Sequence, residues 1–380
     1  MKSVLIFYDH FYPAYKSGGP IQSLANMIRS LSGTYRFYIV CKSSEVGEKQ
    51  SLPGIHVNAW NNWEDKAKVF YRSPGRKQIR TARLLDEVKP SIVYINGLYS
   101  LSYNIEPLKA ALQFKRVHKE LKIVVAPRGM LHAGALSQKS FKKKAYFQLF
   151  KGLKWHQKVH WHATDKEEQV FIEEKFGSQT AITVAGNFPK KLNPSNSPIK
   201  HKGELILGTI ALISPMKNHL AVIQALMTCT SQVLWHVYGP VKDIDYWSKC
   251  EIEIGKLPNN VKVIYHGGLD PQHLQKVFDR FQVFIMPSKS ENFGHALMEA
   301  LSAGKPVITT DTTPLKGLQE HNAGFTLSEK KLSETLTHTI DQMADLDQES
   351  FQRTSQAAMQ LYDELISVKE LEDQYSRLFQ

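Results

Sequence analysis

The chain has 380 residues, which is long for one hydrophobic core and suits two domains. Its composition, 42% hydrophobic and 22% charged, is typical of a soluble globular protein, and no apolar run approaches the roughly 20 residues of a membrane-spanning helix. The cysteines Cys41, Cys229 and Cys250 lack metal-ligand or redox spacing, so we expect free thiols in a reducing cytoplasm.

Charge is distributed unevenly along the chain. The formal net charge is +12: residues 1–200 carry 32 Lys and Arg against 14 Asp and Glu, whereas residues 201–380 carry 16 against 22. This asymmetry predicts that the first half meets an anionic partner, either nucleic acid or a phospholipid surface.

Short apolar strands alternate with amphipathic helices in the first half. Residues 4–8 are apolar over too few positions for a signal-peptide core, and we expect them to form a buried first strand. Continuous Val/Ile runs separated by helices predict a parallel sheet covered on both faces. The expected strands are Val4–Tyr8, Phe37–Cys41, Ile92–Asn96, Ile123–Ala126, Val159–Ala163 and Ala181–Val184, with helices including Ile21–Leu31 and Lys77–Val88.

The alternation restarts after a Pro-, Asn- and Ser-rich segment, Gly186–Gly203, which we interpret as a linker. A second doubly wound domain is therefore expected at 200–360, after a first at 1–190, with the ligand between the two domains at the carboxyl ends of the strands. A last helix at 361–380 is expected to pack back toward the first domain. The expected elements are strands Leu205–Ala211, Val233–Tyr238, Val261–Tyr265, Val283–Pro287 and Pro306–Thr310, and helices Leu220–Met227, His295–Ser302 and Ser350–Phe379.

The most informative segment is Pro287–Leu301, where a buried strand ends, a loop follows and a helix begins near Gly294. The positive end of that helix, with its unpaired N–H groups, suits a diphosphate. On an ideal helix, Glu291 and Glu299 would be separated by about 12 Å of rise. That is too far to flank one anomeric carbon but suits two ends of an extended ligand. The alternative is an N-terminal charge at Glu291 and a solvated helix face at Glu299.

The spacing of Glu291 and Glu299 resembles the E-x7-E signature of retaining GT-B glycosyltransferases, and the segments around it look like glycosyltransferase family 4. The resemblance implies two Rossmann-like domains. It also implies that Glu291 holds donor-sugar hydroxyls and that Glu299 accepts hydrogen bonds from the ribose. The donor-binding residues implied in this segment are Glu291, Asn292, Phe293, Gly294, His295 and Glu299.

Lys217 lies in a segment, Ile213–Asn218, that resembles the family's S-P-x-K-N turn, whose lysine contacts the diphosphate. A cation opposite the developing charge of the leaving group would stabilise the transition state. The alternative is a solvated lysine at a helix start, an unfavourable place for a cation. The family often has arginine where this chain has Leu212, so either Lys217 works with less help or Arg128 enters the site.

Arg128 follows a buried strand in a segment that resembles the family's first-domain P-H/R-G-M-L run. Many relatives carry histidine at this place. A guanidinium does not deprotonate, so we expect Arg128 to hold a phosphate or an acidic acceptor rather than act as a base. His132 is a second candidate for acceptor binding, with a purely structural histidine as the alternative.

Three further strand ends resemble donor-binding segments of the family. Gly18 and Gly19 lie at a strand-to-helix turn, where glycine lets the backbone approach a phosphate closely. Tyr238 and Gly239 resemble a strand end at the nucleotide, and His266 follows a strand like the one beside the nucleobase. His266 could equally be a core or rim histidine.

Residues 139–158 contain seven lysines and no acid, interleaved with aromatic residues. Such a helix can lie in a membrane interface. It could instead contact nucleic acid, or pack its aromatic residues into the first core. We favour weak membrane association and expect no nucleic-acid partner.

We therefore predict a retaining, metal-independent enzyme without cofactors, in which Glu291, Lys217 and Arg128 are the catalytic residues. It would move a hexosyl or N-acetylhexosaminyl unit from a nucleotide-sugar, with UDP preferred, to a saccharide or lipid-linked saccharide. Bacterial surface polysaccharide synthesis, such as that of lipopolysaccharide, is the expected setting, in the cytoplasm or at the inner face of its membrane. The alternatives are a nucleotide-sugar epimerase on the same fold and a non-enzymatic basic adaptor that binds membranes or nucleic acid.

Overall fold

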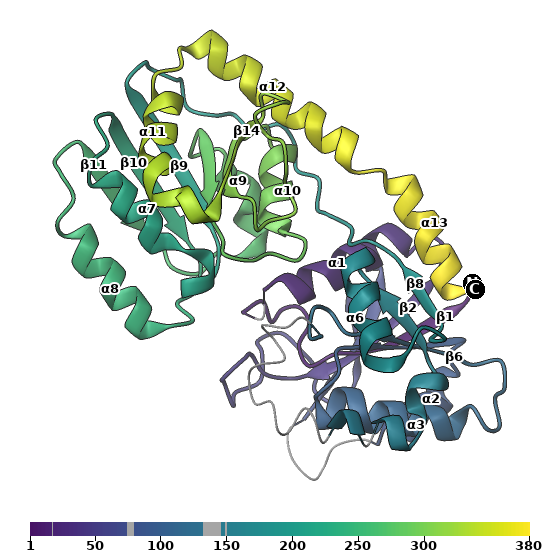
Figure 1. The fold of residues 1–380 in the computed structure, drawn as a ribbon. Coiled ribbons are helices and arrows are strands. Elements are labelled where there is room, and N and C mark those ends of the chain that lie inside the picture. The colour runs from purple at the N-terminus through teal and green to yellow at the C-terminus, as the bar shows by residue number, and fades with distance from the viewer. Residues whose placement is uncertain (17, 74–79, 132–145, 149) are drawn as a thin grey trace. The chain divides into compact units, whose positions relative to one another are not determined.

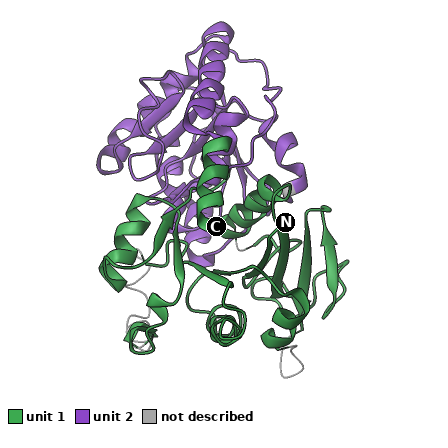
Figure 2. Ribbon diagram, turned by 90° about the vertical axis from the view of Figure 1, so that its right-hand side faces the viewer, with its two compact units in different colours: residues 1–188, 368–380 green, residues 189–367 purple. Residues whose placement is uncertain are grey.

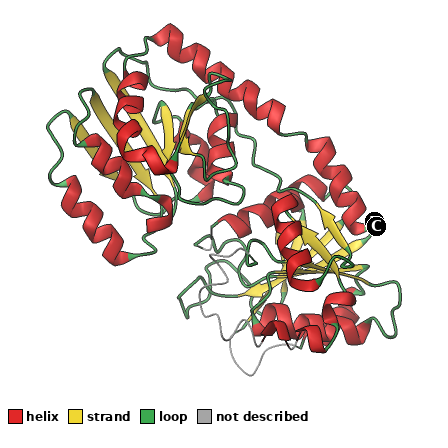
Figure 3. Ribbon diagram, viewed as in Figure 1, coloured by secondary structure: helices red, strands yellow, loops and turns green. Residues whose placement is uncertain are grey.

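The computed structural model describes residues 1–16, 18–73, 80–131, 146–148 and 150–380 (Figure 1). These residues form two compact units, one of residues 1–188 and 368–380 and one of residues 189–367 (Figure 2). Each unit is a mostly parallel sheet with helices on both faces (Figure 3). The predicted α/β class, with two doubly wound parallel-sheet domains, is confirmed.

The first unit is built on a sheet with the strand order β3-β4-β2-β1-β5-β6-β7-β8, in which β3 pairs antiparallel with β4 and the other neighbours pair parallel. Its strands are β1 (Ser3–Phe7), β2 (Arg36–Lys42), β3 (Trp60–Trp63), β4 (Ala67–Arg72), β5 (Ile92–Asn96), β6 (Lys122–Ala126), β7 (His160–Ala163) and β8 (Ile182–Val184). Its helices are α1 (Gly19–Leu31), α2 (Thr81–Val88), α3 (Glu106–Phe114), α6 (Lys166–Phe176) and α13 (Val368–Phe379), with a π-helical turn η1 (Leu101–Ile105) and a 3₁₀ turn η2 (Trp155–Gln157).

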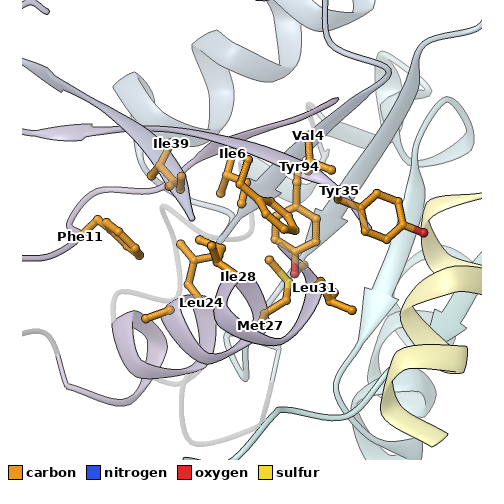
Figure 4. Packing of buried hydrophobic residues seen from close by; sticks show 14 of the residues in the cluster. Val4, Ile6, Phe11, Leu24, Met27, Ile28, Leu31, Tyr35, Ile39 and Tyr94 are labelled. Atoms are coloured by element: carbon orange, nitrogen blue, oxygen red, sulfur yellow. The ribbon is translucent and has the colours of Figure 1, made fainter. Parts of the chain in front are cut away.

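Successive residues of β1 enter two different cores, which explains its unbroken apolar run. Val4 and Ile6 pack with α1 and α13, and the side chains of α1 reach across to them in Figure 4. Leu5 and Phe7 pack on the opposite face with residues of α2, α3 and α6.

The second unit is built on a parallel sheet with the order β11-β10-β9-β12-β13-β14. Its strands are β9 (Glu204–Ile210), β10 (Gln232–Tyr238), β11 (Val261–Tyr265), β12 (Val283–Met286), β13 (Val307–Thr310) and β14 (Gly324–Leu327). Its helices are α7 (His219–Leu226), α8 (Ile244–Ile254), α9 (Leu274–Phe278), α10 (His295–Ser302), α11 (Leu332–Ala344) and α12 (Gln348–Leu365), with 3₁₀ turns η3 (Pro215–Lys217), η4 (Pro271–His273) and η5 (Glu329–Lys331).

The expected strands are present to within a residue or two, but β3, β4 and β14 were missed. Two of these lie at sheet edges, where a strand needs fewer apolar residues: β3 is Trp-Asn-Asn-Trp and stays half-exposed. The helical stretch expected at Ser350–Phe379 consists of two helices, α12 and α13. It is broken at Ile366, whose backbone is extended, because α12 packs against α10 in the second unit whereas α13 packs against β8 in the first.

Most of the segment Gly186–Gly203 belongs to the second unit. The boundary between the units lies after Phe188, and the residues beyond it pack on the second unit. Leu192 donates its N–H to Ser302 Oγ at 3.0 Å. The buried Lys200 ammonium donates to three backbone carbonyls, those of His201, Ala344 and Leu346, at 2.6–2.9 Å. The last two lie at the C-terminal end of α11, where a cation complements the helix dipole.

Candidate active site

The start of α10 is shaped by Gly294, which has a left-handed backbone with φ 71° and ψ 54°. This positive φ favours glycine, and a Cβ at this position would also lie 2.8 Å from Leu297 Cδ1. The Gly294 carbonyl accepts the N–H of Leu297 at 2.9 Å, and glycine offers no side chain to cap the first turn. The positive end of the helix thus follows directly on the loop that leaves the buried strand β12.

Lys217 and Glu291 form an ion pair, although they are 74 residues apart in the chain. Their side chains are 20% and 13% exposed, so the pair is partly shielded from water. Ser288 Oγ donates to the same oxygen, Glu291 Oε1, at 3.1 Å. Lys217 follows β9 and Glu291 follows β12, and the strand order changes direction between these two strands. The pair therefore lies at the topological switch point of the sheet, where open α/β sheets bind their ligands.

Two threonines that we did not predict hold the Glu291 loop. Thr310 and Thr312 donate their hydroxyls to the Ser288 carbonyl at 2.5 and 2.7 Å. The Thr312 carbonyl in turn accepts the N–H of Glu291 at 3.4 Å. The sequence signal was a group of threonines at the end of β13 and just after it, and β13 is the neighbour of β12 in the sheet.

Glu299 is only 4% exposed, so the alternative of a solvated helix face is wrong. Burial raises the pKa of its carboxyl from 4.5 to about 8, and the charge of Lys190 opposes that shift. Glu291 lies in the loop before α10 rather than on the helix. The ideal-helix separation between the two glutamates therefore does not apply.

The residues between the two glutamates lie together at the start of α10. Asn292 is exposed, and the Phe293 ring meets His295 edge to face with 4.7 Å between the ring centroids. Phe293 also packs on the core beneath α10. The whole predicted segment from Glu291 to Glu299 is thus one local structure.

Tyr238, Gly239 and His266 meet at the ends of β10 and β11. The Tyr238 and His266 rings are stacked, with centroids 4.3 Å apart and planes 7° apart. A Cβ on Gly239 would lie 1.8 Å from the Ala211 carbonyl oxygen, so only glycine fits. His266 Nε2 is 2.9 Å from His236 Nδ1, and burial lowers the pKa of both rings, that of His236 to about 4.

In the first unit, Gly18 and Gly19 begin α1, and Gly18 has a positive φ of 68°. Glu45, which is 5% exposed, accepts the N–H groups of Tyr15 and Lys16 in the loop before them, at 2.8 and 3.3 Å. Sequence reasoning missed Glu45. A charged residue soon after β2 was the available signal, but only the fold shows that it holds this loop.

Arg128 forms hydrogen bonds with several residues of the first unit. Its guanidinium donates to Asn96 Oδ1, Asn187 Oδ1 and the Tyr94 hydroxyl at 2.7–2.8 Å. It also hydrogen bonds to Tyr375 of α13. These contacts tie two strand ends and the last helix together, which is a structural role that the sequence did not suggest. His132 lies outside the described residues.

Much of the predicted basic stretch, residues 139–145 and 149, lies outside the described residues as well. Of the described part, Phe147 and Phe150 are buried in the first unit, and Tyr146 and Trp155 pack against the same core. Lys151 and Lys154 are exposed. The aromatic residues described here therefore stabilise the core.

The described ranges contain neither a candidate metal site nor a candidate membrane span. No group of three or more His, Cys, Asp or Glu residues there could hold a metal ion. No helix in these ranges has the length and apolar character needed to cross a membrane. Cys41, Cys229 and Cys250 are buried free thiols.

Comparison with known proteins gives a family match in the second unit. Residues 191–360 match the profile of the family described as glycosyl transferases group 1. A comparison with curated proteins finds no sequence match.

The whole chain resembles solved structures at low sequence identity. HepE from Anabaena, solved with UDP-glucose, shares 16% identity at a TM-score of 0.65, covering 100% of this chain and 99% of its own. Sucrose-phosphate synthase from Thermosynechococcus elongatus shares 13% at 0.70, with 100% and 98% covered. WaaG, a glycosyltransferase involved in lipopolysaccharide biosynthesis, shares 12% at 0.63, with 99% of both chains covered. The chain thus has the two-domain GT-B fold of these structures, and its residues 191–360 resemble the group 1 glycosyl transferases.

Proposed function

We propose that the protein transfers a hexosyl or N-acetylhexosaminyl unit, with retention of configuration, from a nucleotide-sugar to a hydroxyl of a saccharide or lipid-linked saccharide. The observation that carries this proposal is the contact of Lys217 with Glu291 at the switch point of the second sheet, beside the start of α10. The Lys217 ammonium and the N-terminus of α10 suit the negative charge of the donor's diphosphate. The Glu291 carboxylate suits the hydroxyls of the donor sugar.

The proposed chemistry needs a stabilised leaving group. The α10 N-terminus and Lys217 would hold the departing diphosphate, and Glu291 would accept the sugar hydroxyls. Donor binding would then break the ion pair between Lys217 and Glu291, because the Lys217 ammonium would turn toward the diphosphate. We propose front-face attack, in which the diphosphate takes the acceptor proton, and we assign no role to a metal ion or cofactor.

The rest of the donor would extend along the carboxyl ends of the strands in the same sheet. Glu299 would accept the ribose hydroxyls, and the stacked rings of Tyr238 and His266 would lie near the nucleobase, beside Gly239. Asn292, Phe293, Gly294 and His295 would contact the donor at the start of α10. HepE was solved in complex with UDP and with UDP-glucose, which supports UDP as the nucleotide of the donor.

For the first unit we propose acceptor binding, and we propose Gly18 and Gly19 as further donor-binding residues. We propose that Arg128, held by Asn96 and Tyr94, binds a phosphate or an acidic group of the acceptor and takes part in catalysis. We retain His132 as a proposed acceptor contact. Bacterial surface polysaccharide synthesis is the proposed setting, by analogy with WaaG.

A screen of UDP- and GDP-sugars by thermal shift tests the donor, followed by product analysis with saccharide acceptors and NMR of the new glycosidic bond. We expect a UDP-sugar to raise the melting temperature and Glu291→Gln to abolish transfer. Glu320→Gln is the matched control, since Glu320 is an exposed carboxylate of the same unit. A crystal with donor in which the start of α10 stays empty contradicts the proposal, and an inverted product contradicts retention alone.

We also propose peripheral association with an anionic membrane at the cytoplasmic face, through the lysines of residues 139–158. Replacing Lys142, Lys143 and Lys144 with glutamine should weaken binding to liposomes that contain anionic lipid. Unchanged binding would discard the membrane contact and leave the donor assignment intact.

A further inference from the structure

The first unit contains a polar cluster at its own topological switch point, and the roles assigned above do not use it. The sheet order changes direction between β1 and β5. Asp9, just after β1, accepts a hydrogen bond from Ser100 Oγ, after β5, at 3.0 Å. Lys42, the last residue of β2, forms an ion pair with the same oxygen of Asp9 at 2.7 Å. In open α/β sheets, ligands bind at such a switch point.

Lys42 has a second cation beside it. Lys42 and Arg72 are register partners at the ends of β2 and β4. Both charges lie over the ring of Tyr103, with Lys42 Nζ 5.8 Å and the Arg72 guanidinium 5.9 Å from its centroid. The two like charges repel each other, and each has one carboxylate to offset it, Asp9 for Lys42 and the half-exposed Glu106 for Arg72.

The charge of Arg72 is only partly compensated. Its side chain is 2% exposed, and its nearest carboxylate, Glu106, is 3.8 Å away and 48% exposed. The guanidinium donates to Thr81 Oγ1 at 2.8 Å and to the Ser102 carbonyl at 3.4 Å, and the Thr81 hydroxyl in turn donates to Glu106. Within the described residues, no acceptor meets its buried Nε. Water screens the buried charge of Arg72 far less than the charge of the half-exposed Glu106 carboxylate. The electrostatic field of Arg72 therefore extends to the protein surface above it.

Lys42 is placed to use that field. Its side chain is 41% exposed, so a ligand can reach it, and the ammonium has three N–H donors, of which Asp9 takes one. Asp9 and Ser100 fix the position of Lys42 at the carboxyl ends of the strands. Lys42 would thus be the contact residue, with Arg72 acting through the electrostatic field from beneath.

We propose that this cluster is an anion subsite, in which Lys42 binds a phosphate or carboxylate group of the acceptor. The assignment of this anionic group to the acceptor rests on the proposed function. The existence of an anion subsite at Lys42 does not. The excess of Lys and Arg in residues 1–200, 32 against 14 Asp and Glu, draws an anionic ligand toward the same unit.

The experiment measures binding of inorganic phosphate, sodium glucuronate and glucose by calorimetry at low ionic strength. The variants are Lys42→Gln, Lys42→Arg and two controls. Lys68→Gln removes an exposed cation from β4 in the same unit, and Lys217→Gln removes the cation of the donor site. Circular dichroism confirms that each variant is folded.

We expect the dissociation constant for phosphate or glucuronate to rise about tenfold or more in Lys42→Gln and to recover in Lys42→Arg. Lys68→Gln and Lys217→Gln should leave this binding event unchanged, and glucose should not bind there. Phosphate alone, or glucuronate alone, would identify which anion the subsite takes.

Equal affinity in Lys42→Gln and the unaltered protein overturns the proposal. So does an equal loss in Lys68→Gln, or complete loss in Lys217→Gln, because the anion would then be bound by general surface charge or at the donor site. UDP affinity is measured in the same samples. A protein that binds no nucleotide would refute the proposed function, while the phosphate result would still decide the subsite.

Discussion

Replacing Glu299 by glutamine should make the stability of the second unit less sensitive to pH. The folded carboxyl has a pKa of about 8, raised from 4.5 by burial, so between these values the folded state keeps a proton that the unfolded state has released. The stabilisation that this proton gives is complete below about pH 4.5 and is lost as the pH rises through 8. From this group alone, the free energy of unfolding falls by about 1.4 kcal/mol per pH unit in that window.

The glutamine variant does not titrate and has the same shape, so it should lack this fall. We expect its free energy of unfolding, relative to that of the unaltered protein, to rise by about 2 kcal/mol between pH 6.5 and 8. His219 and His236 have pKa values lowered to about 4 by burial, but they are present in both proteins and cancel in the difference.

Hydrogen exchange of the α10 and α12 amides measures this difference, because comparison at equal pH removes the intrinsic exchange rates. Glu320→Gln is the control, since an exposed carboxylate of the same unit should leave the pH dependence unchanged. UDP binding is measured alongside, and we expect a loss of about tenfold in affinity with Glu299→Gln. Identical pH slopes would refute the argument from burial, and an unchanged UDP affinity would remove the ribose assignment.

Three further substitutions test the site and its supports. Lys217→Gln should lower kcat about 100-fold at saturating donor, and a normal rate in steady-state assays would reject the leaving-group role. Gly294→Ala should lower the free energy of unfolding by about 1–3 kcal/mol in urea, because alanine must adopt a φ of 71° against Leu297. Arg128→Met should destabilise the first unit by about 3 kcal/mol in thermal unfolding, since its partners lose their donors. A melting temperature that stays the same would show that these bonds do not hold the unit together.

The repeating order of strands and helices could be predicted because its signal is local. An apolar run such as Val4–Phe7 is unbroken because both sides of a covered parallel strand face a core. The loop and helix around Gly294 were readable for the same reason, since strand end, glycine and helix start follow one another along the chain. The strand Trp60–Trp63 could not be predicted, because a strand at the edge of a sheet needs few apolar side chains.

The burial of Glu299 could not be predicted from its own segment. Its environment is completed by α12, whose residues Leu361 and Tyr362 share a core with α10 about 60 positions earlier in the chain. The same holds for Arg128, whose partners come from β5, from Asn187 and from α13. A carboxylate or guanidinium shows in the sequence, but the neighbours that decide its charge and its freedom do not.

The sequence by itself determined two parallel-sheet domains, the glycine turn before α10 and the residue types that can hold a diphosphate, because each follows from periodicity and local backbone preference. Only the tertiary structure decided which charges meet. It pairs Lys217 with Glu291 across 74 residues, buries Glu299, commits Arg128 to the frame and sets Lys42 beside Arg72. The physical reason is that side-chain electrostatics depend on distance and burial, and both are set by strand order and helix packing rather than by position along the chain.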